Sequence, residues 1–380
     1  MSTTLNSEQR MLQDSVNRFG REYYDFEEWR KVVASGKAFE DKNWSRMAEL
    51  GWLGIALPES VGGMDGSLRD AMVLMEEFGR SLMLEPYIST SLLGGSLLLE
   101  GNPDLAADLL PAMVDGRLRI AIALAEPGAR FDLARVAATA RSEGEDFILS
   151  GYKTNVADCS TAHWLIVPAR TTSTFSDRYG VSLFLVPVNA DGISVDHYRG
   201  PDYRHFSDVA LDNVRVSGAY QLGPLHQGLD LLERCVDRAI LASLAETLGV
   251  MDGARDLTLE YLKTREQFGR KIGEFQVLQH RMVDIAIACE EARSITYAAL
   301  NQIDGPPEAR RRGVSAAKVR VAQTSRFVGQ QAVQLHGGIG TSDELIVSHY
   351  LRRLAMLEVR FGNADHHLQL FADLPLALAA

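Results

Sequence analysis

The sequence predicts an α+β fold that is mostly α, because a β-rich middle region lies between two long helical regions. Residues 1–118 show helical apolar spacing, residues 119–227 contain short β-rich runs, and residues 228–380 return to the helical period. We therefore expect three domains: an N-terminal helical domain, a middle β-barrel or sandwich, and a C-terminal four-helix bundle.

In the first region glycine and proline, rather than strands, separate the helical segments. Leu57–Gly66 is a glycine-rich break, after which Met72–Phe78 resumes the helical period. Pro86 and the pair Gly94 and Gly95 are expected to interrupt the helices again.

The middle region contains five short β-rich runs separated by turn residues, a spacing typical of a small barrel or sandwich. A doubly wound sheet would need helices between the strands, and the sequence shows none there. The runs are 120–125, 147–152, 164–169, 181–187 and 209–216.

The last region predicts long helices with identifiable breaks. A helix that starts well upstream runs to Tyr261 and ends in a basic, aromatic elbow, and a second helix begins near Phe275. Gly305–Pro307 and Gly337–Gly340 each separate a further pair of helices. From these residues alone, the elbow is a solvated turn between two core helices.

Composition narrows the class of protein. The net charge of −11 and pI near 5.4 argue against a nucleic-acid surface. The first residues are polar and no apolar run is long enough to span a membrane, so neither a signal peptide nor a membrane span is expected. Three widely separated cysteines fit a reducing cytoplasm, and no metal-ligand spacing is present.

Two segments together carry a resemblance to a known family. Arg265–Gln276 reads Arg-x-x-Phe-Gly-x-x-Ile-x-x-Phe-Gln, and Gln334–Gly340 reads Gln-Leu-His-Gly-Gly-Ile-Gly. A lone glycine run of this kind is usually a loop, although it can expose backbone N–H groups to a phosphate. Together the segments resemble the acyl-CoA dehydrogenases, flavoproteins that desaturate acyl-CoA thioesters. The order of helical and β regions extends this likeness over essentially the whole chain.

In that family both segments contact the FAD of a neighbouring subunit. The resemblance implies that Arg265 pairs with the pyrophosphate, that Phe268 packs beside the nucleotide and that Gln276 lies near it. Four residues of the second segment are implied to close around the adenosine end. These residues are Gln334, Leu335, Gly337 and Gly338.

Two further segments resemble flavin-binding parts of the family but depart from them. Glu126–Asp132 is similar to a Thr-Glu-Pro-x-Ala-Gly-Ser-Asp loop whose backbone borders the flavin ring, although composition alone predicts only a Pro-Gly turn. Here Ala125 replaces Thr or Ser, and Arg130 and Phe131 replace Gly-Ser. Lys153–Ala157 stands where the family has Lys-x-Trp-Ile-Thr, so the Trp and the Thr hydroxyl are absent.

The catalytic base is the largest departure. The family's reaction removes an α-proton with a carboxylate while a hydride leaves the β-carbon for flavin N5, which requires a buried base with a raised pKa. Most members place this Glu in Tyr-Glu-Gly-Thr. That motif follows an Arg at a fixed spacing. Counted from Arg352, the position of the Glu falls on Phe361, and Gly362 follows it, so no base exists there. Glu358 lies about one helical turn away and is not favoured.

A minority of the family carry the base early in the helix that leads to the elbow, directly before an Arg. Here that pair is Asp237 and Arg238, two residues earlier than the usual spacing from Gly249. The resemblance implies Asp237 as the base and Arg238 as a substrate contact. Glu246 faces roughly the same side of the helix and is the second candidate. The alternatives are an exposed salt bridge of Asp237 with Arg234 or Arg238, and no base in this chain.

Val347–Arg353 and Phe361–Leu368 look like the small-subunit branch of the family. That branch includes the pimeloyl-CoA dehydrogenase small subunit and subunits of steroid-degrading acyl-CoA dehydrogenases. The resemblance implies FAD, an acyl-CoA substrate from fatty acid or steroid degradation, an electron-transferring flavoprotein as acceptor, and a homotetramer or heterotetramer.

The leading expectation is therefore an FAD-dependent acyl-CoA dehydrogenase. The alternative is a non-catalytic or half-site subunit that completes FAD sites and assembly in a heteromeric enzyme. A flavin monooxygenase or nitroalkane oxidase on the same fold is a third interpretation.

Overall fold

The computed structural model describes residues 4–172 and 178–374 of the 380-residue chain. The helices are α1 (Ser7–Tyr23), α2 (Phe26–Ser35), α3 (Asp41–Glu49), α4 (Leu68–Arg80), α5 (Gly95–Gly101), α6 (Pro103–Val114), α7 (Gly228–Thr264), α8 (Gln276–Leu300), α9 (Pro307–His336), α10 (Ile346–Val359) and α11 (Ala364–Asp373). The strands are β1 (Ile120–Ile122), β2 (Thr139–Glu143), β3 (Asp146–Ala157), β4 (Trp164–Arg170), β5 (Val181–Pro187), β6 (Ile193–Arg199), β7 (His205–Ser217), β8 (Gln221–Leu222), β9 (Glu266–Gln267) and β10 (Arg270–Lys271).

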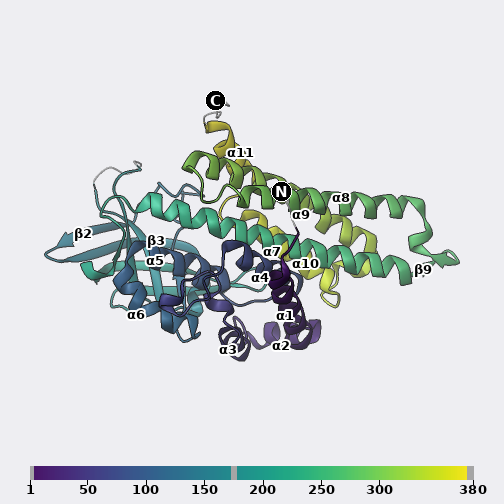
Figure 1. The fold of residues 1–380 in the computed structure, drawn as a ribbon, viewed down its shortest axis with the longest axis horizontal. Helices are drawn as coiled ribbons and strands as arrows, with labels where there is room; N and C mark the ends of the chain where they lie inside the picture. The colour runs from purple at the N-terminus through teal and green to yellow at the C-terminus, as the bar shows by residue number, and fades with distance from the viewer. Residues whose placement is uncertain (1–3, 173–177, 375–380) are drawn as a thin grey trace. The chain divides into compact units, whose positions relative to one another are not determined.

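The chain, drawn as a ribbon in Figure 1, divides into two compact units. The helical unit comprises the described residues within Met1–Lys31, Arg69–Met83 and Ile240–Ala380. The sheet unit comprises the described residues within Val32–Leu68 and Leu84–Ala239. Helix α7 begins in the sheet unit and continues into the helical unit, so its two ends present residues to different cores.

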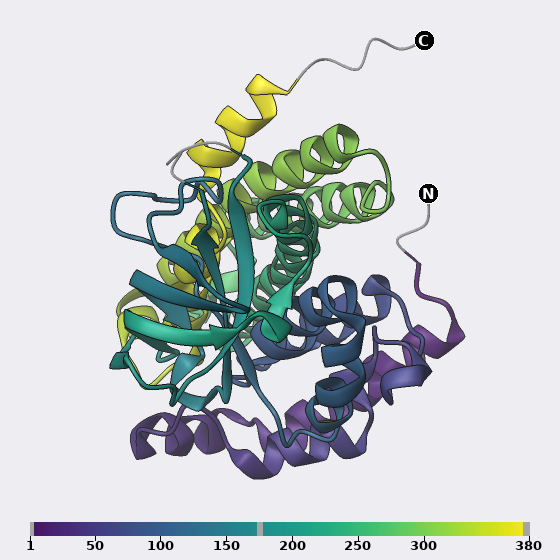
Figure 2. The same ribbon diagram turned by 90° about the vertical axis from the view of Figure 1, so that its left-hand side faces the viewer.

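The sheet unit is built around one main sheet (Figure 2). Its strands follow the order β6-β7-β3-β2-β4-β5-β8. Strand β1 pairs in parallel with β4, whereas β4 and β5 form an antiparallel pair from Trp164 opposite Pro187 to Arg170 opposite Val181. Both β4 and β5 are buried along almost their whole length, as expected of apolar strands covered on both faces.

The predicted interruption at Gly94 and Gly95 is wrong. A π-helix, η3 (Ile88–Gly94), runs directly into α5, whose first residue is Gly95. A Cβ added to Gly94 would lie 2.9 Å from Cβ of Ile120 in β1. The glycine therefore lets the helix approach the strand closely and does not end the helix.

Long helices dominate the helical unit. Helices α7, α8 and α9 contain 37, 25 and 30 residues, and α8 and α9 lie side by side (Figure 1). Helix α9 begins at Pro307, a first-turn position where the missing N–H removes no helical hydrogen bond. It ends at His336, and Gly337 follows with a φ of +69° that a helix cannot continue.

Helices α4 and α7 approach closely at two glycines. A Cβ on Gly249 would lie 1.7 Å from the carbonyl oxygen of Glu76, and one on Gly79 would lie 2.1 Å from the carbonyl oxygen of Glu246. No side chain fits at either position, so the two helix backbones are in direct contact. This approach brings charged side chains of neighbouring turns within reach of each other.

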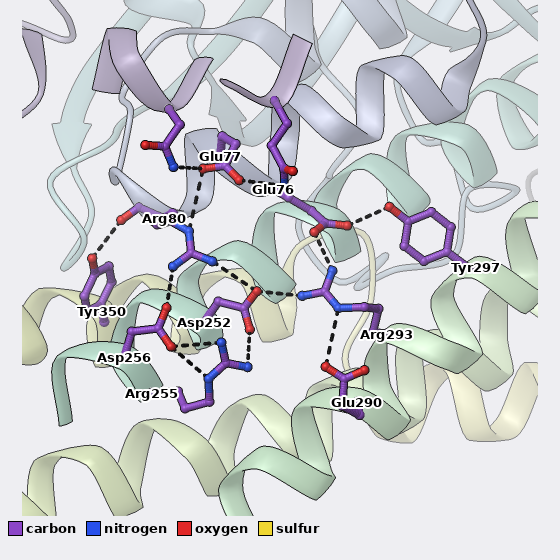
Figure 3. A network of polar contacts seen from close by, with 12 residues as sticks. Glu76, Glu77, Arg80, Asp252, Arg255, Asp256, Glu290, Arg293, Tyr297 and Tyr350 are labelled. Atoms are coloured by element: carbon purple, nitrogen blue, oxygen red, sulfur yellow. Dashed lines mark hydrogen bonds and ion pairs between the residues drawn. The ribbon is translucent and has the colours of Figure 1, made fainter. Parts of the chain in front are cut away.

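A network of charged side chains joins α4, α7 and α8 (Figure 3). Asp252 Oδ2 accepts hydrogen bonds from Arg293 at 2.6 Å and from Arg80 at 3.3 Å. Arg293 also pairs with Glu76, and the Tyr297 hydroxyl donates to Glu76 Oε1 at 2.8 Å. Burial raises the pKa of Glu76 and Arg293 opposes that shift. The network satisfies its charges with partners on different helices.

These elements confirm the predicted fold class: N-terminal helices, a middle sheet region and a C-terminal helical region. The described strands do not close into a barrel, and of the two predicted forms the sandwich fits. None of the helices in the described part of the chain is both long and apolar enough to cross a membrane. Within residues 4–172 and 178–374, no group of three or more His, Cys, Asp or Glu side chains is arranged to hold a metal ion.

Replacing Arg293 by Met tests the network. Glu76 would lose its arginine partner while remaining buried, so we expect R293M to lower the free energy of unfolding by about 3–5 kcal/mol. Urea unfolding followed by circular dichroism measures this change. R117M is the control, because Arg117 and Asp115 form an exposed pair at 2.7 Å whose loss costs less than about 1 kcal/mol. Equal losses in the two variants would show that the network adds no stability.

Candidate functional site

The elbow between α7 and α8 is a tight β-hairpin in which β9 pairs with β10. Phe268 and Gly269 form its turn with φ values of +55° and +75°. A two-residue turn of this kind requires positive φ at both positions, which glycine adopts readily and an aromatic residue only under strain. Phe268 is also 91% exposed. A strained, exposed aromatic side chain adds little to the core of its own chain and points to an external contact.

Two arginines of the elbow have different surroundings. The guanidinium carbon of Arg270 lies 4.0 Å from the ring centroid of Phe275, and the rings of Phe268 and Phe275 meet edge to face at 6.2 Å. Arg265 is exposed, and its side chain has no partner among the residues that the structure describes. Gln276, the first residue of α8, is also exposed. An unpaired guanidinium beside an exposed ring suits a phosphate attached to an aromatic base.

The second predicted segment lies at the end of α9. Gln334 is exposed and Leu335 is buried, and the helix ends at His336. A Cβ added to Gly337 or Gly338 would meet nothing within 4 Å. The space beside this bare backbone is open, so a ligand can approach the main chain here without meeting a side chain.

Tyr261 and His336 join the two segments. Tyr261 lies one turn before Arg265, and its ring stacks on that of His336 with centroids 4.5 Å apart and an interplanar angle of 28°. The Tyr261 hydroxyl donates to the His336 carbonyl oxygen at 3.4 Å. The fold therefore brings together segments whose contacting residues are 75 positions apart in the sequence.

These groups fit a dinucleotide such as FAD. Arg265 offers a guanidinium that is not paired with any acid of the described chain and can bind a pyrophosphate in a bidentate manner. Phe268 offers an exposed ring, and Gly337 and Gly338 leave the backbone accessible. All of these residues, the candidate cofactor wall, belong to the helical unit.

In the sheet unit, a buried ion pair joins the two segments expected to border the flavin ring. Lys153 Nζ lies 2.6 Å from Glu126 Oε1 and donates to the Pro168 carbonyl oxygen at 2.7 Å. Glu126 also accepts from the backbone N–H groups of Ala137 and Ala138 at 2.6 and 3.1 Å. Burial lowers the pKa of Lys153, and Glu126 opposes that shift. This pair holds the loop that begins at Glu126 closed against β3.

A polar cluster that the sequence analysis does not single out fixes the chain just after Lys153. Asn155 has a φ of +52° at a register shift between β3 and β7. Asp208 on β7 accepts from the Asn155 N–H at 3.0 Å, and from the hydroxyls of Tyr152 at 3.2 Å and Tyr198 at 3.1 Å. These residues come from three strands, so no local motif marks them. The positive φ of Asn155 and the register shift beside it are visible only in the structure, so the sequence carried no signal for this cluster.

Asp237 and Arg238 lie near the start of α7, in the part that belongs to the sheet unit. Asp237 is buried, with 9% exposure. Arg234 and Arg238 each bind one oxygen of Glu100 at 2.7 Å. The two arginines therefore share a carboxylate on α5, and Asp237 does not lie on an exposed face. A buried carboxylate is a candidate for proton transfer if a substrate reaches it.

Glu246 is held by arginines of the helical unit. Arg353 Nε and Nη2 lie 2.8 and 2.6 Å from Glu246 Oε1, and Arg360 Nη1 lies 3.7 Å from Oε2. Glu358 similarly pairs with Arg326. Protonation would cost Glu246 a buried charge pair, so its geometry favours a structural role.

Phe361 occupies a strained corner between α10 and α11. Its φ is +59°, and Gly362 follows with a φ of +116°. Lys318 Nζ donates to two carbonyl oxygens at the end of α10, each at 2.8 Å, and His367 Nε2 lies 3.1 Å from the Phe361 carbonyl oxygen. Buried groups from α9 and α11 thus fix the corner, while the side chain at its tip has no proton to exchange.

Family models match most of the chain in three consecutive parts. The model described as acyl-CoA dehydrogenase, N-terminal domain, matches residues 6–117. The middle-domain model of the same family matches residues 121–214, and the C-terminal-domain model matches residues 226–373.

Relatives and solved structures agree with these matches. The chain is 29% identical over 366 residues to the caffeyl-CoA reductase-Etf complex subunit CarC of Acetobacterium woodii, covering 95% of this chain and 96% of that protein. A chain from a variant of the Tcur3481-Tcur3483 steroid ACAD is 32% identical, with a TM-score of 0.88 and 98% of each chain covered. A chain of the ChsE4-ChsE5 complex from Mycobacterium tuberculosis is 25% identical, with a TM-score of 0.90 and full coverage of both chains, 100% in each case.

The corner at Phe361 is expected to make stability sensitive to acid. Burial lowers the pKa of His367 to about 3, whereas the unfolded chain protonates a histidine at about pH 6.5. The contribution of neutral His367 is therefore complete above about pH 6.5 and declines toward pH 3, by about 1.4 kcal/mol per pH unit. We expect H367Q to reduce the fall in unfolding free energy between neutral pH and about two units below it. H280Q, at an exposed histidine, is the control, and identical pH slopes in the two variants would contradict the assignment.

Proposed function

The chain belongs to the acyl-CoA dehydrogenase family, and we propose that it binds FAD between subunits and takes part in α,β-dehydrogenation of an acyl-CoA thioester. Enzymes of this family are oxidoreductases that act on the CH–CH bond of acyl-CoA. The observation that carries the proposal is the stacking of Tyr261 on His336, which places the elbow beside the glycine turn.

Each residue of this wall has a proposed role. Arg265 binds the pyrophosphate, Phe268 packs beside the nucleotide, and Gln276 lies near it. FAD, when bound, supplies the acceptor for a hydride from the substrate β-carbon. The residues proposed to close around the adenosine end are Gln334, Leu335, Gly337 and Gly338.

Asp237 is the proposed acceptor of the substrate α-proton. Its burial and its place one residue before Arg238 support this role, and the ion pair of Glu246 with Arg353 argues against the second candidate. Arg238 is the proposed substrate contact. In that role it would share its guanidinium between the substrate and Glu100.

The proposed electron acceptor is an electron-transferring flavoprotein, because a relative that aligns along nearly the whole chain is named as part of a complex with one. The proposed setting is a cytoplasm, where the three free, buried cysteines would remain reduced. The steroid enzyme among the similar structures supports a substrate from steroid or fatty acid degradation.

Two observations favour the alternative of a half-site subunit. Phe361 stands at the corner where most of the family carry the base, and both similar structures described above carry two protein names. A subunit of this kind would keep the elbow and the glycine turn, complete FAD sites in a heterotetramer and leave the proton transfer to its partner. If Asp237 acts as the base, the proposed assembly is instead a homotetramer of this chain.

The deciding experiment is to purify the chain alone and record its visible spectrum before and after anaerobic addition of acyl-CoA thioesters of different chain and ring content. A flavin band that bleaches supports the enzyme. Flavin that is retained only after co-expression with a second subunit supports the half-site alternative. Absence of flavin under both conditions would overturn the proposal.

Arg265→Ala tests the wall. We expect R265A to weaken FAD binding about 10- to 100-fold, because a charge-assisted hydrogen bond contributes about 1.5–3 kcal/mol. Fluorescence titration of the apoprotein with FAD measures the effect. K263Q is the control, since Lys263 is exposed nearby and already pairs with Glu260 at 2.8 Å. Equal affinities in R265A and the wild type would remove Arg265 from the site.

Asp237→Asn tests the base. If Asp237 takes the α-proton, the rate of flavin reduction by acyl-CoA in D237N should fall about 10²- to 10⁴-fold. Stopped-flow absorbance follows the reaction. D230N is the matched control, because Asp230 lies two turns earlier on α7 and is exposed. Reduction at the wild-type rate in D237N would leave proton transfer to a partner subunit.

A further inference from the structure

The loop between β1 and β2 carries two arginines that no acid of the described chain neutralises. Arg130 and Arg135 are exposed, and neither side chain has a hydrogen bond or an ion pair within residues 4–172 and 178–374. Asp132 lies between them in the sequence, but its Oδ1 accepts from the Ala134 N–H at 3.0 Å. The next arginine, Arg141, pairs with Glu143 at 3.0 Å. Two guanidinium groups of this loop are therefore available to an external anion.

Arg130 also occupies a strained backbone position. Its φ is +52°, a value that glycine adopts readily and a residue with a long side chain only at a cost in free energy. Gly128 in the same turn has a φ of +77°, and a Cβ added to it would meet nothing within 4 Å, so the space beside the turn is open. The family motif has Gly-Ser where this chain has Arg130 and Phe131. A strained residue whose charged group makes no contact within the described chain points to a function for that group.

Buried charges hold the backbone of this loop in place. Glu126, at its start, accepts hydrogen bonds from two backbone N–H groups at its far end. Arg170 is only 4% exposed, and its Nη2 donates to the Ala134 carbonyl oxygen at 2.6 Å. The exposed side chain of Arg130 therefore extends from a backbone that is already ordered. A ligand that binds to such a loop loses little free energy in ordering it.

We propose that Arg130 binds a phosphate group of the coenzyme A moiety of the substrate. A guanidinium group can bind a phosphate through two parallel hydrogen bonds. FAD also carries phosphates, but Arg265 is the proposed partner of its pyrophosphate. Arg238 shares its guanidinium with Glu100, which leaves Arg130 for the phosphates of coenzyme A. The inference rests on the proposed function and adds to it a residue that recognises the carrier of the acyl group.

Titration calorimetry of the flavin-loaded protein with coenzyme A tests the proposal. R130Q removes the charge and keeps a side chain at the strained position. We expect its dissociation constant for coenzyme A to rise about 3- to 30-fold, because a charge-assisted contact is lost at an exposed and partly screened site. R130K keeps a charge and should recover part of the affinity.

R135Q is the matched control, because Arg135 is an exposed and unpaired arginine of the same loop within the described residues. Its dissociation constant should stay within about twofold of the wild-type value, as expected for the loss of a distant surface charge. Equal losses in R130Q and R135Q would show only a general attraction of the loop for anions and would overturn the proposal.

Truncated ligands identify the phosphate. The difference in affinity between wild type and R130Q should vanish with pantetheine, which has no phosphate. With 3′-dephospho-coenzyme A, a difference that vanishes assigns the contact to the 3′-phosphate, and one that persists assigns it to the pyrophosphate. A difference that persists with pantetheine would show that Arg130 acts by packing, which overturns the proposal.

R130G separates binding from stability. It removes both the charge and the strained side chain, so we expect it to unfold at the wild-type temperature or higher and to bind coenzyme A as weakly as R130Q does. Lower stability with unchanged affinity for coenzyme A would give Arg130 a purely structural role and contradict the proposal. If R130Q does not fold, the comparison of R130G with wild type carries the test.

Titration of the apoproteins with FAD distinguishes the two sources of phosphate. R130Q should bind FAD with wild-type affinity, and a weaker affinity would assign the guanidinium to the FAD pyrophosphate and overturn the proposal. If wild-type protein binds no FAD either alone or with a partner subunit, the proposed function fails. If it binds FAD but either has no affinity for coenzyme A or loses none in R130Q, only this inference fails.

Discussion

The ion pair between Lys153 and Glu126 is the constraint on which the sheet unit's candidate site depends. A fully buried ammonium group is tolerated only when acceptors surround it, and Lys153 finds them on Glu126 and on the carbonyl oxygen of Pro168. The same glutamate binds two backbone N–H groups at the far end of its loop. One buried charge therefore sets the path of both segments that resemble flavin-binding parts of the family. Removing either partner would leave a buried charge uncompensated, so the loop is ordered before any ligand arrives.

Two aromatic residues show how the same backbone strain can be supported in different ways. Phe268 and Phe361 both hold positive φ, at +55° and +59°. At Phe361, Lys318 and His367 bind the surrounding backbone from inside the helical unit, so the chain's own interior maintains the strained corner. Phe268 lies in the two-residue turn of the β9–β10 hairpin, and its side chain is 91% exposed. Its strain has no comparable internal support, which is the physical reason to seek a partner outside the chain for Phe268 and not for Phe361.

The sequence predicted the fold well where a signal was local. Strands β1, β3, β4, β5 and β7 correspond to the apolar runs, and Pro307 and Gly337 mark the ends of α9. The sequence did not predict strands β2 and β6, because they are mostly exposed and polar and therefore lack the apolar pattern that marks a buried strand. The sequence predicts a turn at the elbow, but β9 and β10 contain only two residues each and are too short to show any periodicity. The stacking of Tyr261 on His336 and the contacts of Asp208 could not be predicted, because they depend on which distant elements the fold brings together.

The proposed cofactor wall and the proposed base are separable in this chain. The elbow and the glycine turn belong to the helical unit, and Asp237 belongs to the sheet unit. Phe361 has no acidic group, and Glu246 is engaged by Arg353, so the proposed proton transfer is assigned to Asp237 or, in the alternative proposal, to another subunit. Neither outcome alters the residues proposed to hold FAD. A chain can therefore lose its base without losing its cofactor contacts, and a heteromeric enzyme can divide the two tasks between its subunits. Because buried hydrogen bonds to the backbone fix the corner at Phe361, and its side chain does not, the fold does not depend on an acidic residue at this position.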